Sequence, residues 1–173
     1  KTTKKIPQSK LAKKYNIDLT KKFIIILQHT VTSEINSIEE NFLKTIEVIK
    51  EINIQSIIIL GNSDAGSKQI VKLLKNSQIK GYANVPYVDY INLLQYSSAL
   101  IGNSSSGIIE APFLHIPTIN IGTRQEGRLR SESVIDVEYE PEFYKNKILV
   151  YIISFITFFE KMLKSDKLKM KLL

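Results

Sequence analysis

Two short runs of branched aliphatic residues constrain the fold of this chain more than any other feature. Phe23–Gln28 reads FIIILQ and Ser56–Leu60 reads SIIIL, so neither run alternates polar with apolar residues. A strand that is apolar at almost every position is typical of a parallel sheet covered on both faces. Between the two runs, Ser37–Ile52 carries apolar residues at steps of three and four, which predicts an amphipathic helix.

The same alternation continues to residue 137. The later helices are expected at Lys68–Asn76, Val88–Gln95 and Ile108–Leu114, and the later strands near Tyr82–Val85 and at Ala99–Gly102, Pro117–Ile121 and Val134–Val137. Strand–helix–strand units at this spacing form right-handed crossovers and a parallel sheet with helices on both faces. We therefore predict an α/β, Rossmann-like domain over residues 23–138, preceded by residues 1–22 and followed by a helical segment at 139–173.

Composition narrows the kinds of site that the chain can build. It has no cysteine and only two histidines, and its carboxylates are not clustered, so we expect no metal site. The net charge is +7, but the lysines gather in residues 1–14 and 161–171 without interleaved aromatic residues. Single-strand nucleic-acid binders need such aromatic residues, so we expect solvated helices and no nucleic-acid partner.

The two ends of the chain give no targeting or membrane signal. The first residues, KTTKKIPQSK, are charged and lack a following apolar core, so no signal peptide is predicted and a cytoplasmic location is expected. Ile148–Phe159 runs for twelve residues without a charge. About 20 residues are needed to span a bilayer. We therefore expect no membrane partner, and a buried helix or one that docks on another domain.

A loop rich in serine after an expected strand is the strongest candidate site. Ser104, Ser105, Ser106 and Gly107 stand where a strand ends and a helix begins. The first turn of a helix offers unpaired N–H groups and a positive dipole end, which suits phosphate. Serine hydroxyls add donors, and a glycine lets the backbone approach an anion closely. Plain helix capping by serine is the alternative interpretation.

Glu110 helps to separate these two interpretations. A capping box needs Ser or Thr three residues before the glutamate, but Gly107 stands there. The Glu110 carboxylate is therefore available for a ligand, and adjacent ribose hydroxyls are suitable donors.

Further candidates follow other expected strands. His29 comes directly after the first strand, where an imidazole can act in acid–base chemistry or bind sugar or phosphate. The segment Asn120–Arg130 holds two glycines and three arginines, including Arg124, which suits forked binding of phosphate or carboxylate. For each of them, an ordinary loop residue is the alternative. Asp64 is either a ligand contact or a helix cap, and His115 is interpreted as structural.

Four segments within residues 28–130 together resemble the hydrolysing UDP-N-acetylglucosamine 2-epimerases. In chain order they are QHTVTSE, GNSDAGS, GNSSSGIIEAP and IPTINIGTRQEGRLR. Thr30 stands where the family's first motif has proline, and the resemblance fades beyond about Tyr139. The non-hydrolysing epimerases differ in the serine–glycine loop and the arginine segment.

The resemblance implies a two-lobed GT-B-type fold, with this chain as a fragment containing the C-terminal lobe and residues 1–22 as the interdomain connection and first helix. It implies that pyrophosphate binds at the serine loop, formed by Ser104, Ser105, Ser106 and Gly107. Glu110 would bind the ribose, Arg124 would contact the nucleotide, and His29 would be catalytic. Asp64, in the second motif, is a further candidate for nucleotide binding. The remaining catalytic groups would come from the N-terminal lobe. The implied reaction releases UDP and forms N-acetylmannosamine for sialic-acid-type synthesis, without a cofactor.

Three alternatives remain open from the sequence. The chain could be the donor-binding lobe of a GT-B glycosyltransferase, part of a non-hydrolysing epimerase, or a nucleotide-binding module without catalysis. The resemblance implies UDP and UDP-N-acetylglucosamine as ligands, a partner lobe, and a homo-oligomer in the full-length protein.

Overall fold

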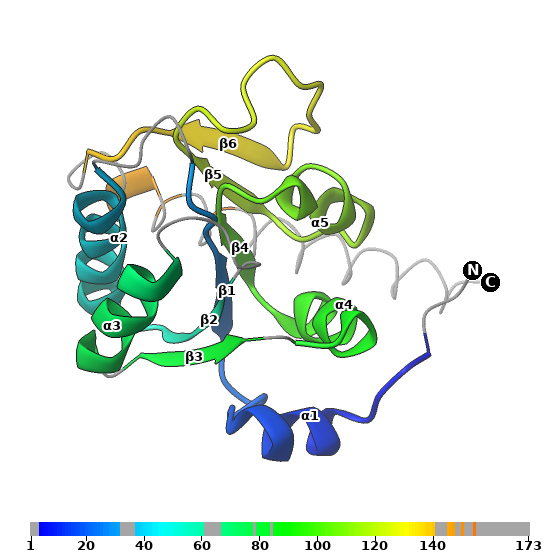
Figure 1. Ribbon diagram of the computed structural model, residues 1–173. Helices are drawn as coiled ribbons and strands as arrows, with labels where there is room; N and C mark the ends of the chain where they lie inside the picture. Colours follow the sequence, from blue (N-terminus) through cyan, green and yellow to red (C-terminus); the bar gives the residue numbers. More distant parts are fainter. Residues whose placement is uncertain are drawn as a thin grey trace.

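A computed structural model describes most of the chain, namely residues 4–31, 37–60, 67–77, 79–83, 85–140, 145–147, 150 and 154. In this part, six strands form one sheet in the order β3-β2-β1-β4-β5-β6 (Figure 1). Every pair of neighbouring strands is parallel. The predicted parallel α/β fold is therefore confirmed.

The elements lie within two residues of their predicted bounds. The strands are β1 (Phe23–Leu27), β2 (Gln55–Leu60), β3 (Lys80–Ala83), β4 (Ala99–Gly102), β5 (Thr118–Ile121) and β6 (Val134–Val137). The helices are α1 (Gln8–Tyr15), α2 (Ile38–Ile52), α3 (Ser67–Ser77), α4 (Tyr87–Tyr96) and α5 (Glu110–Phe113), with a 3₁₀ turn, η2, at Ser105–Gly107.

Strand β1 lies inside the sheet and divides the core into two layers. All five of its residues are buried, and successive side chains point to opposite faces. Ile24 and Ile26 join the layer beneath α2 and α3, whereas Phe23 and Ile25 join the layer beneath α1 and α4. Figure 1 shows α2 and α3 on one side of the sheet and α1, α4 and α5 on the other. The expected two-sided helical cover is confirmed.

Polar contacts hold α1 against α4. The Tyr15 hydroxyl donates to Asp89 Oδ2 at 2.6 Å, and Lys14 Nζ pairs with the same oxygen at 2.5 Å. Burial opposes ionisation of Asp89, but the hydrogen bonds from Lys14 and Tyr15 hold its pKa below the usual value. Tyr82 also donates from its hydroxyl to the Tyr15 carbonyl at 2.5 Å. The N-terminal helix thus packs on the same layer as α4, while the predicted domain boundary at residue 22 stays a prediction.

Two sequence-based expectations fall outside the described residues. Asp64 lies in one gap, and most of Ile148–Phe159 lies in others. Within the described ranges, no helix is both long and apolar enough to cross a membrane.

Candidate functional site

The loops after β1, β4 and β5 meet at one edge of the sheet. β1 pairs with β4 through Leu27 and Gly102, and β4 pairs with β5 through Gly102 and Asn120. Because all three strands run in the same direction, the residues that follow them lie at their shared carboxyl edge. This is the edge at which open α/β sheets bind ligands.

Asn103 connects two candidates from distant parts of the sequence. Its side-chain Nδ2 donates to the His29 carbonyl at 2.9 Å, and its Oδ1 accepts from the His29 N–H at 2.7 Å. Its backbone carbonyl accepts from Arg124 Nη1 at 3.0 Å and from Gln125 Nε2 at 2.8 Å. His29 and Arg124 are therefore brought to one residue. Asn103 and Gln125 have no recognisable signal in the sequence, since neither belongs to a periodic pattern.

Gly102 allows β4 to end against β1. Its φ is 140°, and a Cβ added there would lie 2.1 Å from the Leu27 carbonyl oxygen. No other residue fits so near a backbone oxygen in this conformation. The close approach of Gly102 to Leu27 thus places Asn103 beside the end of β1.

Two of the three serines in the loop use their hydroxyl groups in hydrogen bonds within the protein. Ser104 Oγ accepts from the Ser106 N–H at 3.3 Å, which is the capping interaction that the sequence left open. The Ser106 hydroxyl is hydrogen-bonded to the Tyr90 hydroxyl. Ser104 and Ser106 are buried, whereas Ser105 is half-buried and its hydroxyl makes no hydrogen bond to another described residue. Of the three serines, Ser105 is the most available to a ligand.

Gly107 has a packing role that the sequence did not reveal. A Cβ added to it would lie 2.6 Å from Thr118 Cγ2, so the turn packs directly on β5. From the sequence, this glycine is expected to let an anion approach the backbone, but its contact with β5 already requires a residue without a side chain. An additional role in anion binding stays a prediction.

The helix after this turn is shorter than expected. A helix was predicted over Ile108–Leu114, but η2 comes first and α5 has only four residues. The Gly107 N–H donates to the Ser104 carbonyl at 3.0 Å, which tightens the backbone into a 3₁₀ turn. At the other end, His115 takes a φ of 57° and closes the helix, in agreement with its predicted structural role. A single helical turn has a small dipole, so the predicted helix-end field on phosphate is weaker than the sequence suggested.

Glu110 opens α5 beside a buried tyrosine. It is half-buried, and its carboxylate makes no hydrogen bond or ion pair with another residue of the described part. Burial raises the pKa of Tyr90 to about 12; the hydrogen bond between the Tyr90 and Ser106 hydroxyls acts in the opposite direction, and the charge of Glu110 adds to the rise. Tyr90 had no signal in the sequence, because on α4 it reads as one more apolar helix residue.

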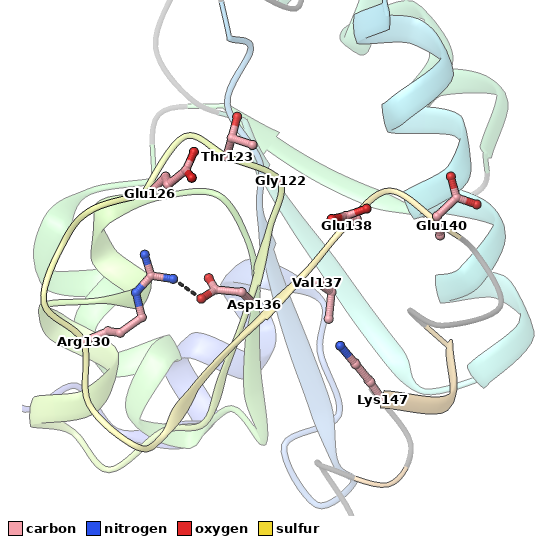
Figure 2. Close-up of a pocket in the computed structure, with 9 residues that line it drawn as sticks. All are labelled: Gly122, Thr123, Glu126, Arg130, Asp136, Val137, Glu138, Glu140 and Lys147. Carbon is pink, nitrogen blue, oxygen red and sulfur yellow. Dashed lines mark hydrogen bonds and ion pairs between the residues drawn. The ribbon is translucent and has the colours of Figure 1, made fainter.

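The arginine segment divides into a fixed part and an accessible part. Arg130 forms an ion pair with Asp136 on β6 (Figure 2). Arg130 also donates from Nη2 to the Gln125 carbonyl at 2.6 Å. Arg130 thereby holds the loop, whereas Arg124 is exposed and uses one donor on Asn103. A guanidinium has five N–H donors, so Arg124 retains most of them for a ligand.

A cavity of about 520 Å³ lies beside this segment, at the ends of β5 and β6 (Figure 2). Its lining includes part of the candidate segment Asn120–Arg130, but none of the residues predicted individually as ligand contacts; the lining residues are Gly122, Thr123, Glu126, Arg130, Asp136, Val137, Glu138, Glu140 and Lys147. Four carboxylates face two cations there, which does not favour a diphosphate. We therefore place the candidate nucleotide site on the open edge around Asn103. The described residues contain no cluster of three His, Asp or Glu side chains that could hold a metal ion.

Known proteins are similar to this chain in both sequence and fold. The sequence pattern of the UDP-N-acetylglucosamine 2-epimerase family matches residues 1–156. "Polysialic acid biosynthesis protein P7" of Escherichia coli is 36% identical over 128 residues, which cover 70% of this chain and 33% of the relative. The hydrolysing UDP-N,N'-diacetylbacillosamine 2-epimerase of Legionella pneumophila is 33% identical over 129 residues, which cover 72% and 34%. The chain spans about a third of the length of these curated relatives.

Solved structures agree on the fold. UDP-N-acetylglucosamine 2-epimerase from Neisseria meningitidis, bound to UDP-N-acetylglucosamine, matches with a TM-score of 0.63 at 20% identity, over 90% of this chain and 42% of that one. ADP-heptose heptosyltransferase II of E. coli matches with a TM-score of 0.64 at 11% identity, over 87% and 53%. At these identities the likeness concerns the fold alone, and it confirms the GT-B-type lobe. The family pattern distinguishes the epimerases from the transferases, and the chain belongs to the UDP-N-acetylglucosamine 2-epimerase family.

Proposed function

We propose that this chain supplies the UDP-binding part of a hydrolysing UDP-N-acetylglucosamine 2-epimerase, which releases UDP and forms N-acetylmannosamine. The observation that carries the proposal is the convergence of His29 and Arg124 on Asn103, directly before the serine turn. Relatives from Legionella pneumophila and Campylobacter jejuni, both hydrolysing 2-epimerases, support the hydrolysing reaction.

The diphosphate would lie against Arg124 and Ser105. Arg124 is exposed and held at one nitrogen, so its other donors can form the paired hydrogen bonds that phosphate favours. Because α5 is a single turn, we assign more of the phosphate's stabilisation to the guanidinium than to the helix end. Holding the charge of UDP as the anomeric C–O bond breaks would lower the barrier to its departure.

Glu110 would accept hydrogen bonds from the ribose hydroxyls, and His29 would reach the phosphate or the sugar. A carboxylate can accept two adjacent O–H donors, and an imidazole can donate or take up a proton near neutral pH. The groups that move protons at the sugar carbons are expected in the rest of the protein. A nucleotide-binding role for Asp64, the cytoplasmic location and the homo-oligomer also stay predictions.

Calorimetric titration of the chain with UDP, UDP-N-acetylglucosamine and GDP tests the proposal. UDP should bind, and Glu110→Ala should weaken it by about tenfold or more, since a hydrogen bond to a charged group contributes about 1.5–3 kcal/mol. The sign of this change is informative. Removing a carboxylate that merely lay nearby would strengthen the binding of an anionic ligand, so only lost hydrogen bonds explain weaker binding.

Glu126→Ala provides a matched control. Glu126 is exposed on the neighbouring arginine segment, so the substitution removes the same charge from a nearby loop. It should leave UDP affinity unchanged or slightly raised. Absence of UDP binding by a folded chain, or steady hydrolysis of UDP-N-acetylglucosamine by it alone, would contradict the proposal.

A further inference from the structure

The side chain of Asn103 acts as an extra backbone unit at the end of the sheet. β1 and β4 are paired as far as Leu27 and Gly102. Beyond that point, the Asn103 side-chain amide takes up the His29 N–H and C=O in two hydrogen bonds of 2.7 and 2.9 Å. A carboxamide carries the same donor and acceptor as a peptide group, so it continues the ladder where the strands end. The backbone of His29 is thereby held in the sheet.

The backbone carbonyl of the same residue holds the arginine segment. It accepts from both Arg124 and Gln125, which occupies both of its lone pairs. Gln125 is buried, whereas Arg124 is exposed. An exposed arginine samples many rotamers, and ordering it on a ligand opposes binding. The contact with Asn103 orders the guanidinium before the ligand arrives.

We propose that Asn103 is a positioning residue of the nucleotide site, which holds the His29 loop with its side chain and Arg124 with its carbonyl. The inference deepens the proposed function and rests on it. Asn103 itself is 1% exposed, so it acts through these two residues and not by touching the ligand. Losing its side chain removes both of these hydrogen bonds from the His29 backbone and lets the carbonyl shift away from Arg124.

Asn92 offers a matched control elsewhere in the chain. Asn92 is also buried, and its side chain also forms hydrogen bonds to backbone groups. Its Oδ1 accepts from the Ile6 N–H at 2.9 Å, and its Nδ2 donates to the Val88 carbonyl at 2.7 Å. It holds the N-terminal segment to α4 and has no contact with the proposed site. Asn92→Ala therefore measures the effect of losing a buried asparagine side chain that holds backbone groups away from the proposed site.

The experiment compares Asn103→Ala and Asn92→Ala by UDP titration of the folded chain. Asn103→Ala should weaken UDP binding by about tenfold, which corresponds to about 1.4 kcal/mol. Asn92→Ala should leave the affinity within about twofold of the original. In an Arg124→Ala background, the effect of Asn103→Ala should shrink but not vanish, because the part that passes through Arg124 is already lost while the part that passes through His29 remains. Equal losses from both asparagine variants, or additive losses with Arg124→Ala, would overturn the proposal.

A second measurement does not depend on UDP. The His29 amide and imidazole signals in NMR spectra should shift in Asn103→Ala and stay in place in Asn92→Ala. Asn103→Asp keeps the acceptor for the His29 N–H but lacks the donor for its carbonyl, so it should restore part of the amide signal. If the chain bound no UDP, the proposed function would fail, yet these signals would still decide whether Asn103 positions His29. Unchanged His29 signals in Asn103→Ala would refute the positioning role.

Discussion

Gly107→Ala tests how the serine turn is attached to the sheet. The added Cβ would lie 2.6 Å from Thr118 Cγ2 and 3.7 Å from Leu100 Cδ2. The second distance is an ordinary contact, but carbon atoms prefer separations of about 3.5–4.0 Å, so the first requires a shift of about 1 Å. Thr118 and Leu100 are each 1% exposed, which leaves no open space for that shift.

The structure sets the size of the effect. A side chain branched at Cβ is stiff at χ1, so Thr118 cannot easily rotate its methyl group away. Overpacking of this kind costs about 1–3 kcal/mol of unfolding free energy. Thr118→Ser removes the obstructing methyl group and on its own should cost about 1 kcal/mol. In the double variant the clash is absent, so the two costs should fall short of additivity by about 1 kcal/mol or more.

Urea unfolding of the two single variants and the double variant measures the coupling energy between positions 107 and 118. UDP titration of the same samples shows whether the substitutions also change UDP affinity. If packing alone requires glycine, the double variant should recover both stability relative to Gly107→Ala and UDP affinity. If an anion also approaches the backbone of Gly107, stability should return while UDP affinity stays low. Strict additivity, or a Gly107→Ala variant as stable as the original chain, would show that the turn does not rest on Thr118.

Two further predictions concern the frame around the site. Since the pKa of Asp89 is lowered on folding, its pairing with Lys14 and Tyr15 should stabilise the chain above the unfolded pKa of about 3.9, and this stabilisation should be lost as pH falls through the folded value. Urea unfolding at several pH values should show this loss, and Asp89→Asn should give a flatter profile. Gly102→Ala should destabilise the chain by more than about 2 kcal/mol in the same assay, since its Cβ would meet the Leu27 carbonyl at 2.1 Å; an effect below about 0.5 kcal/mol would contradict the described approach of β4 to β1.

The strands were predictable where burial dictates their composition. β1 and β2 carry consecutive isoleucines because central parallel strands are covered on both faces. β3 was expected two residues too late, near Tyr82–Val85, whereas it spans Lys80–Ala83. It is an edge strand paired with β2 alone, and three of its four residues are exposed, so its sequence carries little apolar signal.

The contacts of the site were not predictable in the same way. The serine turn was identified because capping chemistry is local and its residue types are distinctive. The hydrogen bonds of Asn103 instead join residues separated by 74 and 22 positions. Such contacts depend on which strands become neighbours and leave no periodic trace along the chain. The same reason explains why Gly107 was attributed to a ligand, since its neighbour Thr118 is known only once β4 and β5 are paired.

The resulting site is anchored to the sheet through side chains and not only through loops. Asp136 on β6 pairs with Arg130, and Arg130 holds the Gln125 carbonyl. Gln125 in turn donates to Asn103, which holds His29 at the end of β1. These hydrogen bonds cross the carboxyl ends of four neighbouring strands, so movement of one loop disturbs partners in the next. A guanidinium beside such a chain requires little reorganisation when a diphosphate arrives, and preorganised charge is the most effective kind for stabilising a leaving group.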